Sequence, residues 1–174
     1  GKIRITYDRP GAVVVNAYDG EDAWMSVESK TNYRKRVDAL PAEQRNALVK
    51  DAPFDNILIR LAADPGDTRL LGRQTIEGRS YYQLQIEPDR PDTERFVFLD
   101  SESLHDAIHR EYHLQTGAVI DTRFGDFREI AGAQIPFRIE RLRDGETEWT
   151  IRIERVDVNL GISESVFERP DAAS

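Results

Sequence analysis

Residues 134–159, QIPFRIERLRDGETEWTIRIERVDVN, decide the fold of this chain. Apolar side chains occupy every second position on both sides of Asp144-Gly145: Ile135, Phe137 and Ile139 before it, and Trp149, Ile151 and Ile153 after it. A period of two predicts a β-strand with one apolar and one polar face. An Asp-Gly pair between two such runs predicts the turn of a hairpin.

The parity of the two apolar rows predicts the length of this loop. A two-residue loop would pair Ile139 with Thr150 and would place the rows on opposite faces. A three-residue loop, residues 143–145, pairs Ile139 with Trp149 and keeps both rows on one face. Gly145 can supply the positive φ that the last position of this loop requires. We therefore predict a long antiparallel hairpin with a G1 bulge.

A second hairpin is predicted near the start of the chain. Residues 12–17 form a strand that follows the turn at Pro10-Gly11. The same parity argument predicts a three-residue loop ending in Gly20. This loop would pair Val15 with Ala23 and Val13 with Met25, which would keep these apolar side chains together.

Two short helices are predicted between the strands. Residues 38–51 have Asp38 as a possible N-cap and Pro41 in the first turn. Apolar residues at i, i+3, i+4 and i+7 predict the second helix, and these residues are Phe54, Ile57, Leu58 and Leu61. Helices between runs of strands, rather than alternating with single strands, favour a sheet with a helical insertion over βαβ units.

From residue 68 onward the sequence is typical of an antiparallel meander. The predicted strands are residues 69–76, 79–87, 95–99 and 119–130, followed by the hairpin. The chain as a whole is therefore predicted to be mainly β (α+β), a curved antiparallel sheet or open half-barrel with a short helical lid insertion. We expect the helices to bury Leu48, Phe54, Ile57, Leu58 and Leu61 against Val13, Val15, Met25, Leu84 and Phe96.

Composition limits the class of protein. A chain of 174 residues is most simply one domain. A formal net charge of −8 argues against nucleic acid as a partner, because phosphate binding requires a basic face. There is no cysteine, which excludes disulfides, thiolate metal sites and a thiol nucleophile.

All histidines lie in one segment, at His105, His109 and His113. On a helix, this spacing would bring neighbours within about 6 Å, close enough to bind zinc. On a strand they would stand about 13 Å apart, too far to share one ion. The surrounding meander favours the strand, so we expect solvent-facing histidines and keep a metal-dependent enzyme as a rival hypothesis.

No catalytic motif is visible. The chain has no Gly-x-Ser-x-Gly, no phosphate-binding glycine-rich loop and no His-Glu-x-x-His. The acidic run at residues 100–103 is typical of a polar turn with capping side chains. We therefore expect a protein that is not an enzyme and needs no cofactor.

Short motifs follow one another along nearly the whole chain: YDGEDAW (18–24), DAPF (51–54), LGRQTIEGR (71–79), FLD (98–100), GDFREIAGAQIP (125–136), VN (158–159) and FERP (167–170). Their order resembles that of the outer-membrane lipoprotein-sorting family (LolA/LolB-like). The motifs are structural rather than catalytic. The resemblance implies an open half-barrel whose helices form a lid, in a periplasmic carrier of the acyl chains of a lipoprotein or another lipid.

The resemblance also implies a single domain over residues 1–174 that lacks the family's N-terminal helix and first strands. No residue here matches the lid-gating arginine of the lipoprotein carriers. A module that senses envelope stress through an envelope protein partner stays as an alternative of the same fold. The side chains expected to line an apolar cavity are Val13, Val15, Met25, Phe54, Leu58, Leu61, Leu84, Phe96, Phe98, Phe137, Ile139, Trp149 and Ile151.

Overall fold

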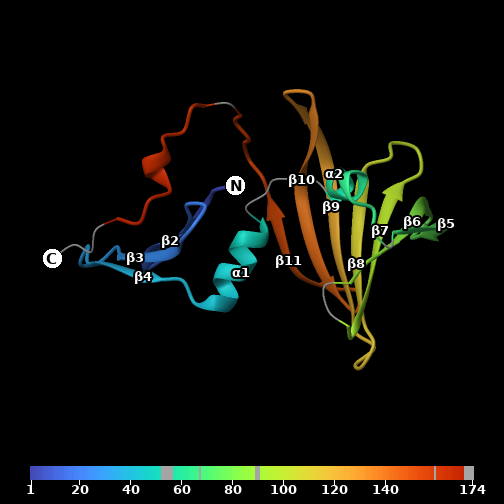
Figure 1. The fold of residues 1–174 in the computed structure, drawn as a ribbon, viewed down its shortest axis with the longest axis horizontal. Coiled ribbons are helices and arrows are strands. Elements are labelled where there is room, and N and C mark those ends of the chain that lie inside the picture. The colour runs from blue at the N-terminus through green and yellow to red at the C-terminus, as the bar shows by residue number, and fades with distance from the viewer. Residues whose placement is uncertain (52–56, 67, 89–90, 159, 171–174) are drawn as a thin grey trace. The chain divides into compact units, whose positions relative to one another are not determined.

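The computed structural model describes residues 1–51, 57–66, 68–88, 91–158 and 160–170. The chain forms two compact units, the first made of Gly1–Asp55 with Asn159–Ser174 and the second of Asn56–Val158. Each unit is built on one antiparallel sheet, and helices are few (Figure 1). The prediction of a mainly β protein with antiparallel sheets and a small helical insertion is confirmed. The sequence did not indicate that the strands divide between two sheets.

The first unit contains a small sheet of strands in the order β1-β2-β3-β4. Its strands are β1 (Ile3–Asp8), β2 (Ala12–Tyr18), β3 (Ala23–Ser29) and β4 (Lys35–Ala39). The helix α1 (Ala42–Asp51) and the 3-10 turn η1 (Glu164–Val166) complete the unit.

The predicted register of β2 and β3 is wrong. The loop has four residues, so that Tyr18 lies opposite Ala23 and Val15 lies opposite Ser26. The Asp19 carboxylate accepts hydrogen bonds from the backbone N–H groups of Glu21 and Asp22, at 2.9 and 2.8 Å, and so stabilises this longer loop. As a result, Met25 points to the face opposite that of Val13 and Val15.

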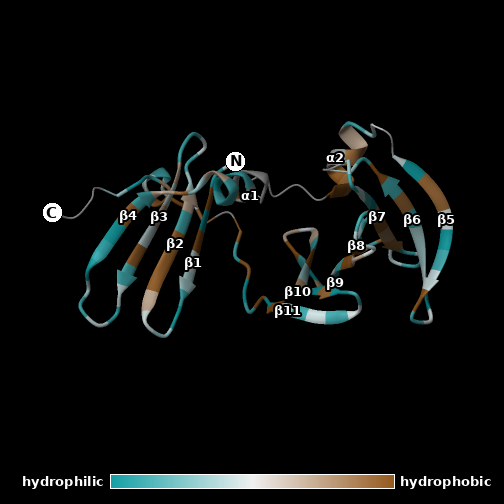
Figure 2. Cartoon of the chain, turned by 90° about the horizontal axis from the view of Figure 1, so that it is seen from below, coloured by the Kyte–Doolittle hydropathy of each residue, from teal (hydrophilic) through white to brown (hydrophobic). Residues whose placement is uncertain are grey.

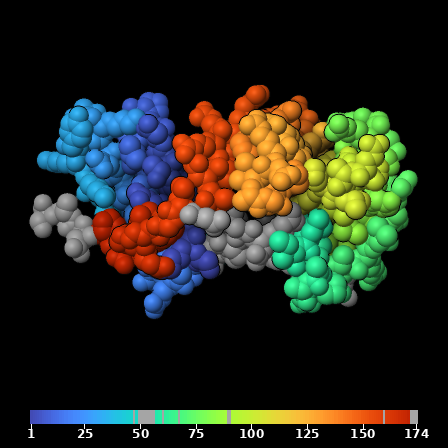
Figure 3. Space-filling model, turned by 90° about the horizontal axis from the view of Figure 1, so that it is seen from above, coloured from blue at the N-terminus to red at the C-terminus, as the bar shows by residue number. Residues whose placement is uncertain are grey.

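Both faces of the small sheet are covered, which explains why parity failed there. On one face, Met25 packs in a cluster with Ala23, Leu40 and the α1 residue Leu48. On the other face, Val15, Ala17 and Trp24 form a buried cluster. Residues 164–170 lie against the small sheet (Figure 3), and the Trp24 indole N–H donates to the backbone oxygen of Phe167 at 2.8 Å. When both faces bury apolar side chains, a strand has no single apolar row to set its register.

The predicted helix start at Asp38 is also wrong. Asp38 belongs to β4 and lies opposite Met25. The helix begins at Ala42, and the backbone N–H of Arg45 donates to the oxygen of Pro41 at 2.8 Å. Val37 packs against the Trp24 cluster, so burial on the sheet holds residues 35–39 in an extended strand.

The second unit contains a large sheet in the order β11-β10-β9-β8-β7-β6-β5, so each described strand pairs with its neighbours in sequence. The helix α2 (Ile57–Ala63) precedes it. Figure 2 shows that the large sheet is strongly curved. The strands are β5 (Arg69–Ile76), β6 (Arg79–Ile86), β7 (Thr93–Asp100), β8 (Asp106–His113), β9 (Val119–Ile130), β10 (Ala133–Arg143) and β11 (Glu146–Arg152).

The face of the large sheet that carries α2 is called here the helix face. Ile57, Leu58 and Leu61 of α2 pack in a cluster with Leu84, Ile86, Val97 and Leu99. Leu58, Leu61 and Leu84 therefore pack against the same buried cluster, in agreement with the predicted packing of the second helix. Phe54 lies outside the described residues.

The opposite face of the large sheet has its own core, which consists of Tyr81, Phe98 and Ile108 with Phe96 packed against it. The Tyr81 and Phe98 rings meet edge to face, with centroids 6.5 Å apart. The prediction that the helices bury Phe96 is wrong, because Leu84 lies opposite Val97 and the neighbouring residues of β7 therefore point to the other face.

The hairpin of β10 and β11 has a shorter loop than predicted. Arg143 lies opposite Glu146, and Asp144 and Gly145 both have positive φ, 51° and 86°, as a two-residue type I′ turn requires. A bulge at Glu148 then shifts the register, so that Ile139 lies opposite Ile151 instead of Trp149. The bulge returns both apolar rows to one face. The predicted strands and their shared face are thus confirmed, and the predicted loop and register are wrong.

We expect Phe98→Ala to lower the free energy of unfolding by about 3–5 kcal/mol, because Phe98 is only 1% exposed and fills the core of the opposite face. Urea denaturation followed by circular dichroism measures this loss. Phe96→Ala is the matched control, since Phe96 is on the same strand and face but only half-buried. Equal losses for the two variants would contradict the described core.

Candidate ligand-binding site

The helix face can be followed residue by residue across the large sheet. The registers place side chains directly opposite one another in a single line: Leu84, Val97, His109, Thr122, Arg141 and Trp149. Residues that are opposite in neighbouring strands point to the same face. Trp149 at one edge of the sheet therefore shares a face with the strand residues beneath α2.

Apolar side chains gather at the β10–β11 end of the helix face. We call Phe137, Ile139, Trp149 and Ile151 the hairpin row. Phe137 is buried and Ile139 half-buried, but Trp149 is 42% and Ile151 48% exposed. Large apolar side chains that stand together and remain open to solvent indicate a binding surface more strongly than scattered ones do.

Polar side chains separate the hairpin row from α2. His109 and Thr122 line a small cavity of about 80 Å³ together with Arg141, Ile86 and Val97. The His109 Nε2 lies 2.7 Å from a carboxylate oxygen of the buried Asp106. The helix face is thus apolar under α2, polar in the middle and apolar again at the hairpin, a pattern that suits an amphiphile.

The predicted cavity residues do not all share this face. Those on the helix face are Leu58, Leu61, Leu84, Phe137, Ile139, Trp149 and Ile151. Phe96 and Phe98 belong to the core of the opposite face. Val13 and Val15 pack with Trp24, and Met25 packs with α1, both within the first unit. A ligand-binding role for any of them stays a prediction.

The histidines lie on or beside β8, as the meander suggested. The ring of His105 stands over Phe127, with centroids 4.4 Å apart, and that of His109 meets the edge of Phe124 at 4.9 Å. Within the described residues, no group of three or more acidic or histidine side chains could hold a metal ion. The described helices include none that is long and apolar enough to cross a membrane.

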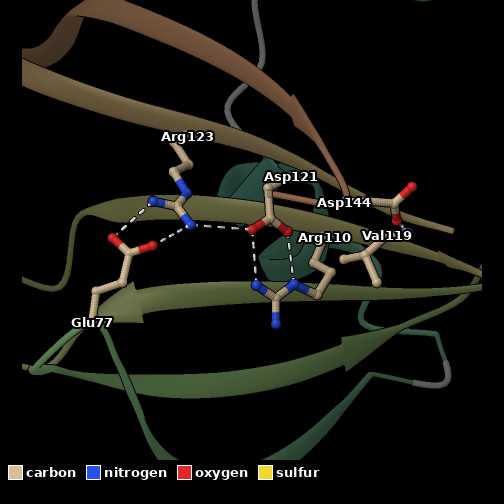
Figure 4. Close-up of polar contacts among 6 residues, drawn as sticks. All are labelled: Glu77, Arg110, Val119, Asp121, Arg123 and Asp144. Atoms are coloured by element: carbon tan, nitrogen blue, oxygen red, sulfur yellow. Dashed lines mark hydrogen bonds and ion pairs between the residues drawn. The ribbon is translucent and has the colours of Figure 1, made fainter. Parts of the chain in front are cut away.

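A line of four charged side chains, called here the charge ladder, crosses the opposite face (Figure 4). The guanidinium of Arg110 donates to both oxygens of Asp121, at 2.7 and 2.8 Å. Arg123 donates to both oxygens of Glu77, at 2.8 and 2.9 Å, and lies 3.6 Å from Asp121. Arg110 also stands 5.4 Å from the ring centre of Phe98, so the ladder adjoins the buried aromatic core.

The pKa values follow from these contacts. Hydrogen bonds from Arg123 lower the pKa of the Glu77 carboxyl, and the hydrogen bond to Asp121 raises the pKa of Arg110. Both shifts favour the charged forms of Glu77 and Arg110. No sequence pattern reveals the charge ladder, because its residues come from β8, β9 and the β5–β6 turn, and only the strand registers bring them together.

No protein-family model and no curated protein matches the sequence. A solved structure from Vibrio parahaemolyticus, described as an outer membrane lipoprotein-sorting protein domain, aligns with a TM-score of 0.52 and 12% identity over 95% of this chain and 74% of that chain. A DUF1329 family protein from Desulfovibrio piger aligns with a TM-score of 0.55 and 17% identity, again over 95% and 74%. A LolA superfamily protein from Nitrosomonas europaea aligns at 0.42 and 15% identity over 97% and 87%. The first two alignments show that the chain shares the fold of these two proteins, one of which is described as an outer membrane lipoprotein-sorting protein domain, and the sequence motifs predicted this fold.

We expect Asp121→Ala to destabilise the protein by about 2–4 kcal/mol. The change leaves Arg110 next to the aromatic core without its carboxylate, and removal of one partner of a buried ion pair is costly. Asp157→Ala removes an ion pair with the exposed Arg155 and should cost less than about 1 kcal/mol. Urea unfolding of both variants measures the difference. Similar small losses would mean that the ladder contributes little to the fold.

Proposed function

We propose that this protein is a non-enzymatic periplasmic carrier or chaperone that binds the acyl chains of a lipoprotein or another lipid. The observation that carries the proposal is the exposure of Trp149 and Ile151 in the hairpin row, which stands on the same face of the sheet as α2. The LolA-like fold supports it, since one protein of this fold is described as a lipoprotein-sorting domain. In this proposal the acyl chain lies along the helix face and α2 is its lid.

The size of the lid fits a reversible exchange. Helix α2 has seven residues, too few for a stable helix in water on its own, so it depends on its packing. Its anchors are Ile57, which is buried, and Leu58 and Leu61, which are half-buried. Their burial contributes on the order of 1.5–3 kcal/mol for a fully buried side chain and less for the others.

The ligand offers a comparable or larger gain. Each buried methylene contributes about 0.8 kcal/mol, so a chain of about 14 carbons offers roughly 11 kcal/mol before ordering costs. Displacement of α2 uncovers Leu84, Ile86, Val97 and Leu99, which then extend the apolar surface toward the hairpin row. An acyl chain can therefore replace the contacts that it removes.

Lipid extraction is the direct test of the proposed function. Protein purified from a Gram-negative periplasm is extracted with organic solvent, and the extract is analysed by mass spectrometry. Stoichiometric acyl lipid supports a carrier. Lipid-free protein that also fails to bind a fluorescent fatty-acid probe would contradict the proposal and favour a module that binds a protein partner.

We expect Ile151→Glu to weaken binding of a fatty-acid probe at least tenfold, because it places a charge in the middle of the hairpin row. Leu114→Glu is the matched control, since Leu114 is an aliphatic residue of similar exposure, 53% against 48%, in the loop after β8. Trp149 supplies a second readout. Its 42% exposed indole should shift its emission to shorter wavelength when lipid covers it, whereas Trp24 is already buried. Equal probe affinities for both variants would place the ligand elsewhere.

We expect Leu58→Ala to lower the free energy of unfolding by about 1–3 kcal/mol and to tighten probe binding, or at least to speed it up. The reason is that Leu58 helps to hold α2 over the helix face. Ile59→Ala is the control on the same helix, because Ile59 is 61% exposed and should change neither quantity. A loss of stability with weaker probe binding would show that α2 is a fixed part of the core and not a lid.

A further inference from the structure

A second cavity lies on the opposite face of the large sheet, away from α2. Its volume is about 490 Å³, within the range of small-molecule sites. The β5–β6 turn, the β7–β8 turn and the middle of β9 form its walls, and the buried side chains of Tyr81 and Ile108 contribute to its lining. Nothing in the proposed acyl site uses these residues.

Most charged groups around this cavity already have partners. Glu77 pairs with Arg123, Asp126 with Arg128 and Glu140 with Arg138. The Asp100 carboxylate accepts hydrogen bonds from the backbone N–H groups of Glu102 and Ser103 and from the Ser103 hydroxyl, as the sequence predicted for this turn. These groups shape the cavity but offer little charge to a ligand.

Two side chains of opposite charge are left, Arg79 and Glu102. Both line the cavity, and neither side chain forms a hydrogen bond or ion pair with another described residue. The segments that carry them lie side by side, because the backbone N–H of Ser101 donates to the oxygen of Ser80 at 3.0 Å and continues the pairing of β6 with β7. The charge of Arg79 contributes to the lowered pKa of Asp100, behind the hydrogen bonds of the turn.

The cavity also has an aromatic wall with open space beside it. The rings of His105 and Phe127 stand 4.4 Å apart at 34°, and both line the cavity. Gly125 on β9 also lines it, and a Cβ added there would meet nothing within 4 Å. The absence of a side chain at Gly125 leaves room for a ring next to Phe127.

We propose that this cavity binds a small zwitterion with a planar ring, of the class of the aromatic amino acids. The ligand carboxylate pairs with Arg79, its ammonium group pairs with Glu102, and its ring packs against His105 and Phe127. Each group of the ligand then meets a group of the protein that has no other polar partner among the described residues. This site is independent of the acyl carrier function, because it lies on the other face of the sheet.

Calorimetric titration of the full chain with L-phenylalanine and L-tryptophan tests the proposal. We expect saturable binding of both, with 3-phenylpropionate and phenethylamine, which each lack one charge, at least tenfold weaker. Arg79→Gln should weaken L-phenylalanine about tenfold and leave phenethylamine unchanged. Arg69→Gln, on the exposed start of β5, is the control and should change neither.

A variant that fills the cavity distinguishes binding inside it from an indirect effect of the Arg79 substitution. Gly125→Val places a β-branched side chain on a strand, at a residue without positive φ, and should preserve the fold while it blocks the cavity. We expect it to abolish amino-acid binding and leave the fatty-acid probe unaffected. Absence of amino-acid binding to the wild type, or unchanged binding to Gly125→Val, overturns this inference. Neither result bears on the carrier function, which the probe tests separately.

Discussion

The burial of β7 on both of its faces is the constraint on which the large sheet depends. Val97 and Phe98 are neighbours in sequence, point in opposite directions and are each 1% exposed. Two different devices cover them. On the helix face, α2 packs over Val97. On the opposite face, the side chains of Tyr81 and Ile108 and the Arg110 of the charge ladder pack around Phe98. Removal of either cover would expose a buried side chain, Val97 or Phe98, to water, unless another apolar group took its place.

This difference between the two covers matters for function. On the opposite face, the cover consists of strands and of paired charges that would lose their partners if they moved apart. On the helix face, the cover is one short helix held by three apolar side chains. Apolar contacts are not directional, so an acyl chain can take the place of a leucine side chain with little change in free energy. In the proposed function, the exchange of α2 contacts for acyl contacts therefore takes place on the helix face.

Two sets of contacts constrain the hairpin at and near its turn. Asp144, in the turn, accepts a hydrogen bond from the backbone N–H of Val119 at 2.8 Å and returns one from its own N–H to the Val119 oxygen. These bonds pin the tip of the hairpin to the start of β9. At Glu148 the extra residue of the bulge is held by Arg141 and Arg143. The hairpin row therefore keeps a defined face although β11 is an edge strand of the described sheet.

The sequence by itself determined the class of fold, the strands of the second unit and the shared face of Phe137, Ile139, Trp149 and Ile151. Alternation of apolar residues encodes the face of a strand, so these followed from the pattern. Alternation of apolar residues shows which residues of two strands share a face, but it does not show which of them lie opposite one another. A two-residue turn with a bulge and a three-residue loop satisfy the same pattern, and the folded chain adopts the first, in which Asp144 bonds to Val119.

Only the tertiary structure decided the rest. In the small sheet, both faces are buried, so parity could not place Met25. The charge ladder joins residues as far apart in sequence as Glu77 and Arg123, and no local pattern distinguishes them from other charged residues of the meander. Likewise, the separation of Phe96 and Phe98 from the helices depends on which residue of β6 lies opposite Val97. Pairing across strands is a property of the folded chain, because long-range contacts choose among registers that the local sequence leaves equal.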